Sequence, residues 1–169
     1  MQTVLILKSE RLYPPAKNHR YDRWQRTAAR NLLNFAFELK RRDAMSEATI
    51  RARLDDLCAA FNDHNLDRLM SYFADDCVLE MPRGPEPHGA RAKGKADVRA
   101  LLATRFEGLP DVHYGDAEHF VDGDCGMSKW LITGTTPDGV KIAARGCDFY
   151  TFRADGLVTR KDSYWKIVT

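Results

Sequence analysis

The sequence VKIAARGCDFYTFRADGLVTRKDSYWKIV, residues 140–168, decides the fold. It contains two runs with strand character, Lys141–Arg153 and Leu157–Val168, on either side of the tripeptide Ala-Asp-Gly at 154–156. Glycine supplies the positive φ that a tight connection between two strands requires. We therefore predict that the end of the chain forms a β-hairpin.

This hairpin carries more polar side chains than a hairpin needs for its own stability. Successive side chains of a strand point to opposite faces of the sheet, so some of these groups face whatever the sheet encloses. The pattern indicates a lined cavity and leaves the ligand open. The polar residues concerned are Asp148, Tyr150, Lys161, Asp162, Ser163 and Tyr164.

The length and composition indicate one soluble globular domain with a full core. The chain has 169 residues, of which 44% are apolar and 30% charged. No apolar run approaches the ~20 residues that span a bilayer, and the first seven residues lack the features of a signal peptide. We therefore expect no membrane partner and a cytoplasmic location. The four cysteines lie far apart without a CxxC pair, which favours reduced thiols over disulfides or a metal site.

The net charge of +2 is unevenly distributed along the chain. Residues 1–44 hold ten Lys/Arg and four Asp/Glu, a net charge of +6, whereas the remaining residues hold sixteen and twenty, a net charge of −4. The basic character therefore belongs to the N-terminal extension. A main domain with this charge gives no electrostatic support for nucleic-acid binding.

The basic extension, residues 1–44, has several open interpretations. Residues 21–42 have apolar side chains at helical spacing. That stretch could be a helix that packs on the domain, mediates self-association or docks to an acidic partner. It could also be a targeting segment, a disordered segment, or a stretch that is not natively translated if the natural product starts at Met45. Residues 45–169 are predicted to form a complete domain.

Within this domain, helical patterns come first and strand patterns follow. Helices are predicted from Ser46 to Phe61, from Leu66 to Phe73 and from Gly94 to Phe106. Strands are predicted at 77–81, 112–121 and 127–136 and in the hairpin, with a loop at 82–93. This order indicates an α+β fold, a curved antiparallel sheet packed with three helices on one face.

From Met45 onward the chain resembles the nuclear transport factor 2-like superfamily, and within it the SnoaL-like and ketosteroid-isomerase-like group. The resemblance implies a cone-shaped sheet, closed by helices around a mainly apolar pocket. It also implies a small hydrophobic ligand, chemistry without a cofactor, and pairing as a homodimer through the outer sheet surface. The motifs that carry it are FNDHNLD at 61–67, YFADDCV at 72–78, GK at 94–95, GLPD at 108–111, GTT at 134–136 and FRADG at 152–156.

Asp148 matches the position where ketosteroid isomerases place an acid in their oxyanion hole. A carboxyl in an apolar site stays neutral and can donate a hydrogen bond to a carbonyl oxygen. The alternative is a carboxylate on the outer face of the sheet or one paired with Arg145 or Arg153. The isomerase base falls on Met81 and the isomerase tyrosine on Leu57, and neither side chain moves protons. Authentic steroid isomerisation is therefore not expected.

Other residues could move the proton. Glu80 precedes Met81 and would point to the opposite face of a regular strand. In the last strand, either Asp162 and Tyr164 or the alternate set containing Lys161 and Trp165 faces the cone, and the register is open from sequence. His113 is a further acid/base candidate, and it shares a face with His119 if the strand is regular.

Aromatic and apolar residues are expected to line the pocket: Trp130, Tyr150, Met81, Leu57, Tyr164 and Trp165. The loop with Arg83, His88, Arg91 and Lys93 either attracts an anionic ligand or is a solvated basic loop. No metal-binding or phosphate-binding motif rises above chance. Two functions remain open for the domain. One is a cofactor-free isomerase, cyclase or dehydratase acting on a hydrophobic carbonyl compound, and the other is a non-catalytic ligand-binding or dimeric interaction module.

Overall fold

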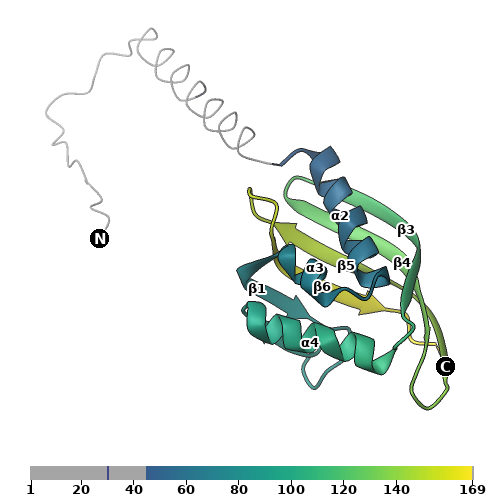
Figure 1. Cartoon of the computed structure of the whole chain (residues 1–169). Helices are drawn as coiled ribbons and strands as arrows, with labels where there is room; N and C mark the ends of the chain where they lie inside the picture. The colour runs from purple at the N-terminus through teal and green to yellow at the C-terminus, as the bar shows by residue number, and fades with distance from the viewer. Residues whose placement is uncertain (1–29, 31–44, 169) are drawn as a thin grey trace, which may run out of the picture. The chain divides into compact units, whose positions relative to one another are not determined.

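A computed structural model describes residue 30 and residues 45–168 of the chain. The predictions on the N-terminal extension fall outside these residues, apart from residue 30. Figure 1 shows the order of the elements along the domain. The helices are α2 (Glu47–Asn62), α3 (Leu66–Ser71) and α4 (Lys95–Gly108), and the strands are β1 (Phe73–Glu80), β2 (Arg91–Lys93), β3 (His113–Asp122), β4 (Cys125–Thr135), β5 (Lys141–Phe152) and β6 (Val158–Trp165).

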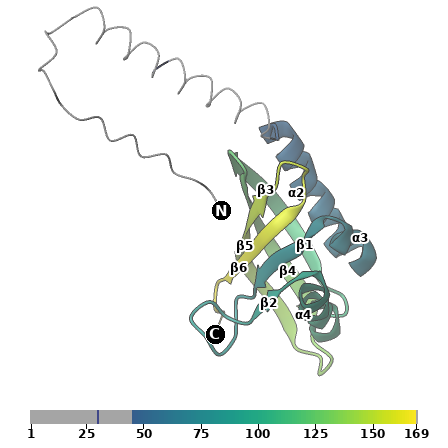
Figure 2. The same ribbon diagram turned by 90° about the vertical axis from the view of Figure 1, so that its left-hand side faces the viewer.

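The six strands form one curved sheet in the order β2-β1-β6-β5-β4-β3. Figure 2 shows the three helices on the same side of this sheet. The predicted α+β fold is confirmed. The sheet is mixed, because β1 pairs with β6 in parallel while every other pair is antiparallel. Within residues 45–168, no helix is long and apolar enough to cross a membrane.

The helices begin where their capping residues predict. Ser46 caps α2, and its Oγ accepts a hydrogen bond from the Thr49 amide at 3.1 Å. Asn65 caps α3 in the same way, accepting from the Arg68 amide at 2.9 Å. Side-chain oxygens in this position satisfy amides that have no partner inside the helix. The apolar stripe of α2 is fully buried against the sheet through Ile50, Leu54, Leu57 and Phe61.

The predicted hairpin is the β5–β6 pair. Gly156 has a φ of +85°, the conformation for which glycine was expected. The Asp155 carboxylate accepts the Leu157 amide at 3.1 Å and closes the turn. The hairpin places Asp148 of β5 directly beside Ser163 of β6, and on its other side beside Ser128 of β4.

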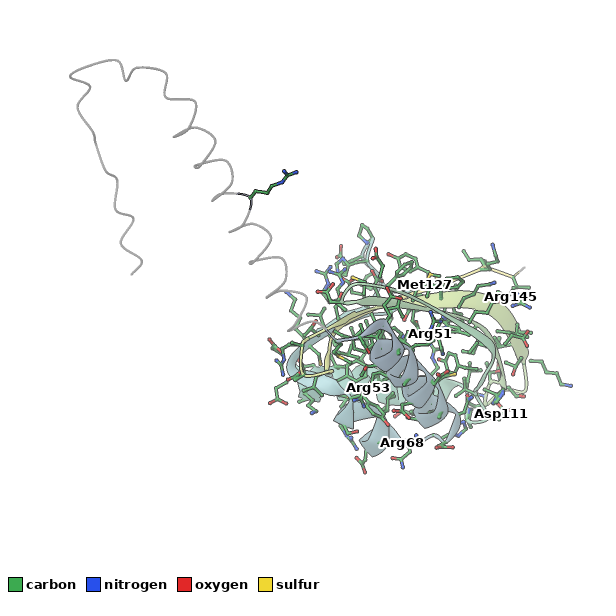
Figure 3. All side chains as sticks on the ribbon, turned by 90° about the horizontal axis from the view of Figure 1, so that it is seen from above. Arg51, Arg53, Arg68, Asp111, Met127 and Arg145 are labelled. Atoms are coloured by element: carbon green, nitrogen blue, oxygen red, sulfur yellow. The ribbon has the colours of Figure 1, made fainter. Side chains whose placement is uncertain are left out.

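The two faces of the sheet differ in character. Asp148, Lys161 and Ser163 are buried on the inner face, beneath the helices. On the outer face, Phe149 and Tyr164 are about half exposed. Figure 3 shows Met127 and Arg145 on the side of the sheet away from α2, and Arg51 and Arg53 along that helix. The register of β6 is thereby established: Lys161, Ser163 and Trp165 belong to the face that the cone encloses.

Strand β3 is not regular, so the condition under which His113 and His119 would share a face is not met. The register between β3 and β4 shifts between Gly115 and Glu118, and Asp116 has a φ of +51°. Such a bulge adds one residue and reverses the side-chain alternation beyond it. As a result, His113 is exposed beside Thr133, whereas His119 lies beside the buried Ser128.

Candidate functional site

Two adjoining spaces lie between the inner face of the sheet and α4. The inner cavity is narrow, with a volume of about 10 Å³, room for about one water. The outer cavity measures about 290 Å³. Met81, Arg105 and Trp165 line both, so these three side chains separate them. The other residues of the inner wall are Phe61, Leu102, Tyr114, Trp130, Asp148, Lys161 and Ser163, and those of the outer wall are Pro82, Arg83, Gly108, Leu109, Thr136 and Ile142.

The inner cavity ends at a buried ion pair. Lys161 Nζ donates to Asp148 Oδ1 at 2.6 Å, and each side chain is only 5% exposed. Lys161 Nζ also donates to Ser163 Oγ at 2.6 Å. The ammonium lies 5.7 Å from the centre of the Phe61 ring and 5.6 Å from that of Tyr150. A charged pair in such a dry environment requires close geometry and further hydrogen bonds.

Asp148 receives two more donors on its second oxygen. The Trp130 indole N–H donates to Asp148 Oδ2 at 3.1 Å, and the Tyr150 hydroxyl donates to the same atom at 3.3 Å. Asp148 is therefore buried, but it is ion-paired with Lys161 and surrounded by hydrogen-bond donors, a pairing that neither interpretation of the sequence included. Both oxygens of Asp148 already accept hydrogen bonds, so the groups free to donate towards a ligand belong to its neighbours.

Lys161 is the neighbour best suited to that task. An ammonium has three N–H donors, and the contacts with Asp148 and Ser163 use two of them. Burial lowers the pKa of Lys161, while the Asp148 carboxylate opposes that shift. The pair therefore combines one hydrogen-bond donor that can face a ligand oxygen with a carboxylate beside it.

The aromatic hydroxyls of the cavity act as hydrogen-bonding groups and not as bases. Burial raises the pKa of Tyr150 well above its ordinary value, and the adjacent Asp148 charge adds to the shift. Burial also raises the pKa of Tyr114, although Arg105 nearby acts in the opposite direction. Both phenols therefore stay protonated at neutral pH.

Glu80 lies outside the cavity. Its side chain is buried on the outer face of β1. In the parallel pairing of β1 with β6, Glu80 lies beside Asp162. Arg91 donates to it from Nε at 2.7 Å, and Arg160 also binds it. Burial alone would raise the pKa of Glu80, but the two guanidinium groups outweigh this effect and lower it. Glu80 is therefore an ion-paired carboxylate that connects β1 to β2 through Arg91 and to β6 through Arg160.

Asp162 and Tyr164 also lie on the outer face. The Tyr164 hydroxyl donates to Asp162 Oδ2 at 3.1 Å, and Tyr164 is 54% exposed. Neither residue lines the inner or the outer cavity. Among the candidate acid/base residues, Asp148 lines the inner cavity, whereas Asp162, Glu80 and His113 do not.

The candidate ligand-binding residues divide in the same way. Trp130, Met81 and Trp165 line the inner cavity. Tyr150 does not line it, but its hydroxyl donates a hydrogen bond to Asp148, which does. Leu57 is fully buried in the core and is not part of the cavity wall. Four of the ten residues that line the inner cavity are aromatic, and Asp148, Lys161 and Ser163 form one hydrogen-bonded group in its wall.

One charged residue of the cavity wall was missing from the sequence prediction. Arg105 lines both cavities from α4, at a position that continues the buried stripe of Val98 and Leu102. A charged residue at an apolar position of the stripe was the available signal. His119, named with His113 from the sequence, lies outside both cavities; its Nδ1 is 2.8 Å from Ser128 Oγ and its Nε2 is 3.1 Å from Asp55 Oδ1.

His119 is buried against α2, and burial lowers its pKa while Asp55 opposes that shift. The contact between Nε2 and Asp55 is close but poorly aligned for a hydrogen bond. No group of three or more possible metal ligands occurs within residues 45–168. The charged and hydroxyl-bearing side chains that line the inner cavity are Asp148, Lys161, Ser163, Arg105 and Tyr114.

Comparison with known proteins agrees with this architecture. The SnoaL-like domain family model matches residues 54–161. A candidate polyketide cyclase from Xanthomonas campestris pv. campestris superposes with a TM-score of 0.62 at 19% identity, over 70% of this chain and 91% of that one. A nuclear transport factor 2-like protein from Burkholderia xenovorans gives 0.61 at 22% identity, with coverages of 72% and 92%.

A third solved structure is TerC, co-crystallised with polyporic acid. It superposes with a TM-score of 0.60 at 20% identity, over 70% of this chain and 92% of TerC. At these identities the likeness establishes the fold and not the activity. A comparison with curated protein sequences gave no match.

Proposed function

The chain belongs to the SnoaL-like domain family, and we propose that it binds a hydrophobic carbonyl compound and catalyses proton transfer on it without a cofactor. The observation that carries this proposal is the buried Asp148–Lys161 pair at the end of an aromatic cavity. A catalytic pair in a dry site can stabilise charge that develops on a substrate oxygen. The reaction class is that of an isomerase, cyclase or dehydratase.

The geometry supports a division of roles between the two residues. Lys161 donates its remaining N–H to the carbonyl oxygen, and the Ser163 hydroxyl holds the ammonium in place. Asp148 accepts the proton from the carbon next to the carbonyl, and the electron pair of that C–H bond passes to the oxygen as an enolate. The enolate is stabilised by the ammonium, and return of the proton to another carbon completes an isomerisation.

The ligand reaches this pair through the outer cavity. Met81, Arg105 and Trp165 separate the two spaces, and all three are long side chains that can change rotamer. Their movement joins the inner cavity of about 10 Å³ to the outer cavity of about 290 Å³. An aromatic wall then holds the apolar body of the ligand.

Proton exchange tests this proposal without knowledge of the natural substrate. The probe is 2-tetralone in D₂O, and NMR measures the loss of its α-protons with and without protein. We expect the protein to accelerate exchange, and Asp148→Asn to remove about 100-fold or more of that acceleration. Asp162→Asn is the matched control, since Asp162 lies on the outer face of the same hairpin, and it should leave the rate unchanged.

A second candidate function is a non-catalytic ligand-binding module. It is favoured by the observation that both oxygens of Asp148 are already occupied by donors. Titration of the same probe by isothermal calorimetry separates the two functions. Binding of 2-tetralone without accelerated exchange would support the binding module, and absence of both would exclude a pocket for hydrophobic ketones.

We also propose that the protein pairs as a homodimer through the outer face of the sheet. Phe149 and Tyr164 are 48% and 54% exposed there, and their ring centroids lie 5.8 Å apart. Exposed aromatic pairs on a sheet face are typical of interaction surfaces. Sedimentation velocity should give a dimer for the wild type and a monomer for Phe149→Glu; a monomeric wild type would contradict the pairing.

A further inference from the structure

The wall of the outer cavity holds two guanidinium groups next to one indole ring. Arg105 of α4 places its Cζ 4.5 Å from the centre of the Trp165 ring, and Arg83 places its Cζ 5.9 Å from the same centre. Both arginines line the outer cavity, and Arg105 also lines the inner one. Two cations from separate segments of the chain thus gather where the outer cavity adjoins the inner one.

Neither guanidinium has a carboxylate within 4.0 Å among residues 45–168. Six other arginines of the domain are ion-paired, namely Arg68, Arg91, Arg99, Arg145, Arg153 and Arg160. Arg51 and Arg53 of α2 have no ion pair in this part of the chain either, but neither of them lines the inner or the outer cavity. Arg105 stacks on Trp165 and lies close to the Tyr114 hydroxyl, and a guanidinium has five N–H donors, so donors remain for a ligand.

The charges on the two cavity walls do not balance. Asp148 is the one acidic residue that lines either space, against Lys161, Arg105 and Arg83. Lys161 already neutralises Asp148. The outer cavity therefore carries an excess of positive charge beside apolar surface from Leu109 and Ile142, and a cleft with low-dielectric walls focuses such a field.

We propose that the ligand of this cavity is a hydrophobic carbonyl compound that carries a carboxylate, bound by Arg105 and Arg83. This inference rests on the proposed function and adds the chemical class of the ligand. The planar guanidinium fork matches a carboxylate in a bidentate arrangement. Because Arg105 lines both spaces, a carboxylate that it holds in the outer cavity directs the carbonyl end of the ligand towards Lys161.

The test compares an acid with its ester, so that one charge is the difference between the probes. The probes are 4-oxo-4-phenylbutanoate and its methyl ester, and isothermal calorimetry at low ionic strength gives each Kd. We expect the wild type to bind the acid about tenfold or more tightly than the ester. Added NaCl should weaken binding of the acid and leave the ester unaffected.

Three variants locate the effect. Arg105→Met should abolish the preference for the acid, and Arg83→Met, at an exposed position that tolerates substitution, should reduce it. Arg145→Met is the matched control, because Arg145 lies on the outer face in an ion pair with Asp116. The ester should bind Arg145→Met as tightly as the wild type, and the ratio of acid to ester Kd within each variant corrects for any change that the substitution makes to the cavity wall.

The outcomes separate this inference from the proposed function. Equal binding of acid and ester by the wild type would overturn the carboxylate site and leave the ketone pocket standing. A preference for the acid that survives in both Arg105→Met and Arg83→Met would also overturn it. Binding of neither probe would overturn both the inference and the pocket on which it rests.

Discussion

Replacement of Lys161 by Met removes the cation of the buried pair while it keeps most of the side-chain volume. The pair is formed over 2.6 Å, and each side chain is 5% exposed. In the variant, the Asp148 carboxylate retains only the neutral donors Trp130 and Tyr150. The expected consequence is a large loss of stability, because a buried charge is left without its counter-ion.

The magnitude follows from the geometry of the pair. At an effective dielectric constant of about 20, two unit charges at this separation attract by about 6 kcal/mol. Desolvation of both ions opposes most of this attraction, so the net contribution of the intact pair is small. Removal of one partner leaves the desolvation of the other uncompensated, and we expect the free energy of unfolding to fall by about 3–5 kcal/mol.

Urea denaturation of four proteins measures this effect: the wild type, Lys161→Met, Asp148→Asn and the double variant. The double variant should be more stable than the sum of the single losses predicts, since neither charge remains. Lys129→Met is the matched control, because Lys129 pairs with Glu118 at the exposed outer face, and it should cost less than about 1 kcal/mol. Equal losses for Lys161→Met and Lys129→Met, or additive losses in the cycle, would refute the buried pair.

Three further predictions concern pH and packing. The pKa of Glu80 is lowered in the folded protein, so its contribution to stability is present above pH 4.5 and is lost as the pH falls through the lowered pKa. In urea unfolding measured against pH, the free energy of unfolding of Glu80→Gln should therefore fall less steeply with acid than that of the wild type. Burial lowers the pKa of His119 below 6.5, so the unfolded state binds the proton first and the free energy of unfolding declines as the pH drops below 6.5. His119→Gln should remove this decline. An unchanged dependence of stability on pH in the variant would exclude His119 as its source. A Cβ at Gly146 would lie 2.4 Å from the Trp130 ring and from the Tyr164 carbonyl oxygen. Gly146→Ala should therefore lower the free energy of unfolding, measured by thermal unfolding, by about 1–3 kcal/mol. Gly108→Ala is the control: a Cβ there has no atom within 4 Å, and the variant should not be destabilised.

Much of the fold could be predicted from local sequence signals. Ser46 and Gly156 mark a helix start and a hairpin turn, and both act as their chemistry predicts. The parallel pairing of β1 with β6 could not be predicted in this way, because the two strands lie about eighty residues apart and no turn connects them directly. The bulge at Asp116 could not be predicted either, because the residue with the left-handed backbone conformation is an aspartate and not the glycine that usually indicates one.

The sequence could predict which side chains of the hairpin are candidates for the site, but it could not predict that Asp148 and Lys161 form an ion pair. Alternation along the hairpin identified Asp148 as an inward candidate, but the direction in which Lys161 points depends on the register of β6. Once the register is known, Lys161 and Asp148 meet across adjacent strands and the apolar site becomes an ionic one. Glu80 illustrates the opposite case, because its partner arginines come from β2 and β6 and fix it on the outer face.

The infrared carbonyl stretch of a bound ketone tests the central claim most directly. The probe is 4-oxo-4-phenylbutanoate with a ¹³C label at the ketone, measured in water and in complex with the protein. If the carbonyl oxygen accepts a hydrogen bond from the Lys161 ammonium, the stretch should move to a lower frequency in the complex than in water. A stretch at the water frequency or above it, in a probe that is bound, would show that the carbonyl meets apolar wall and would contradict the assignment of Lys161.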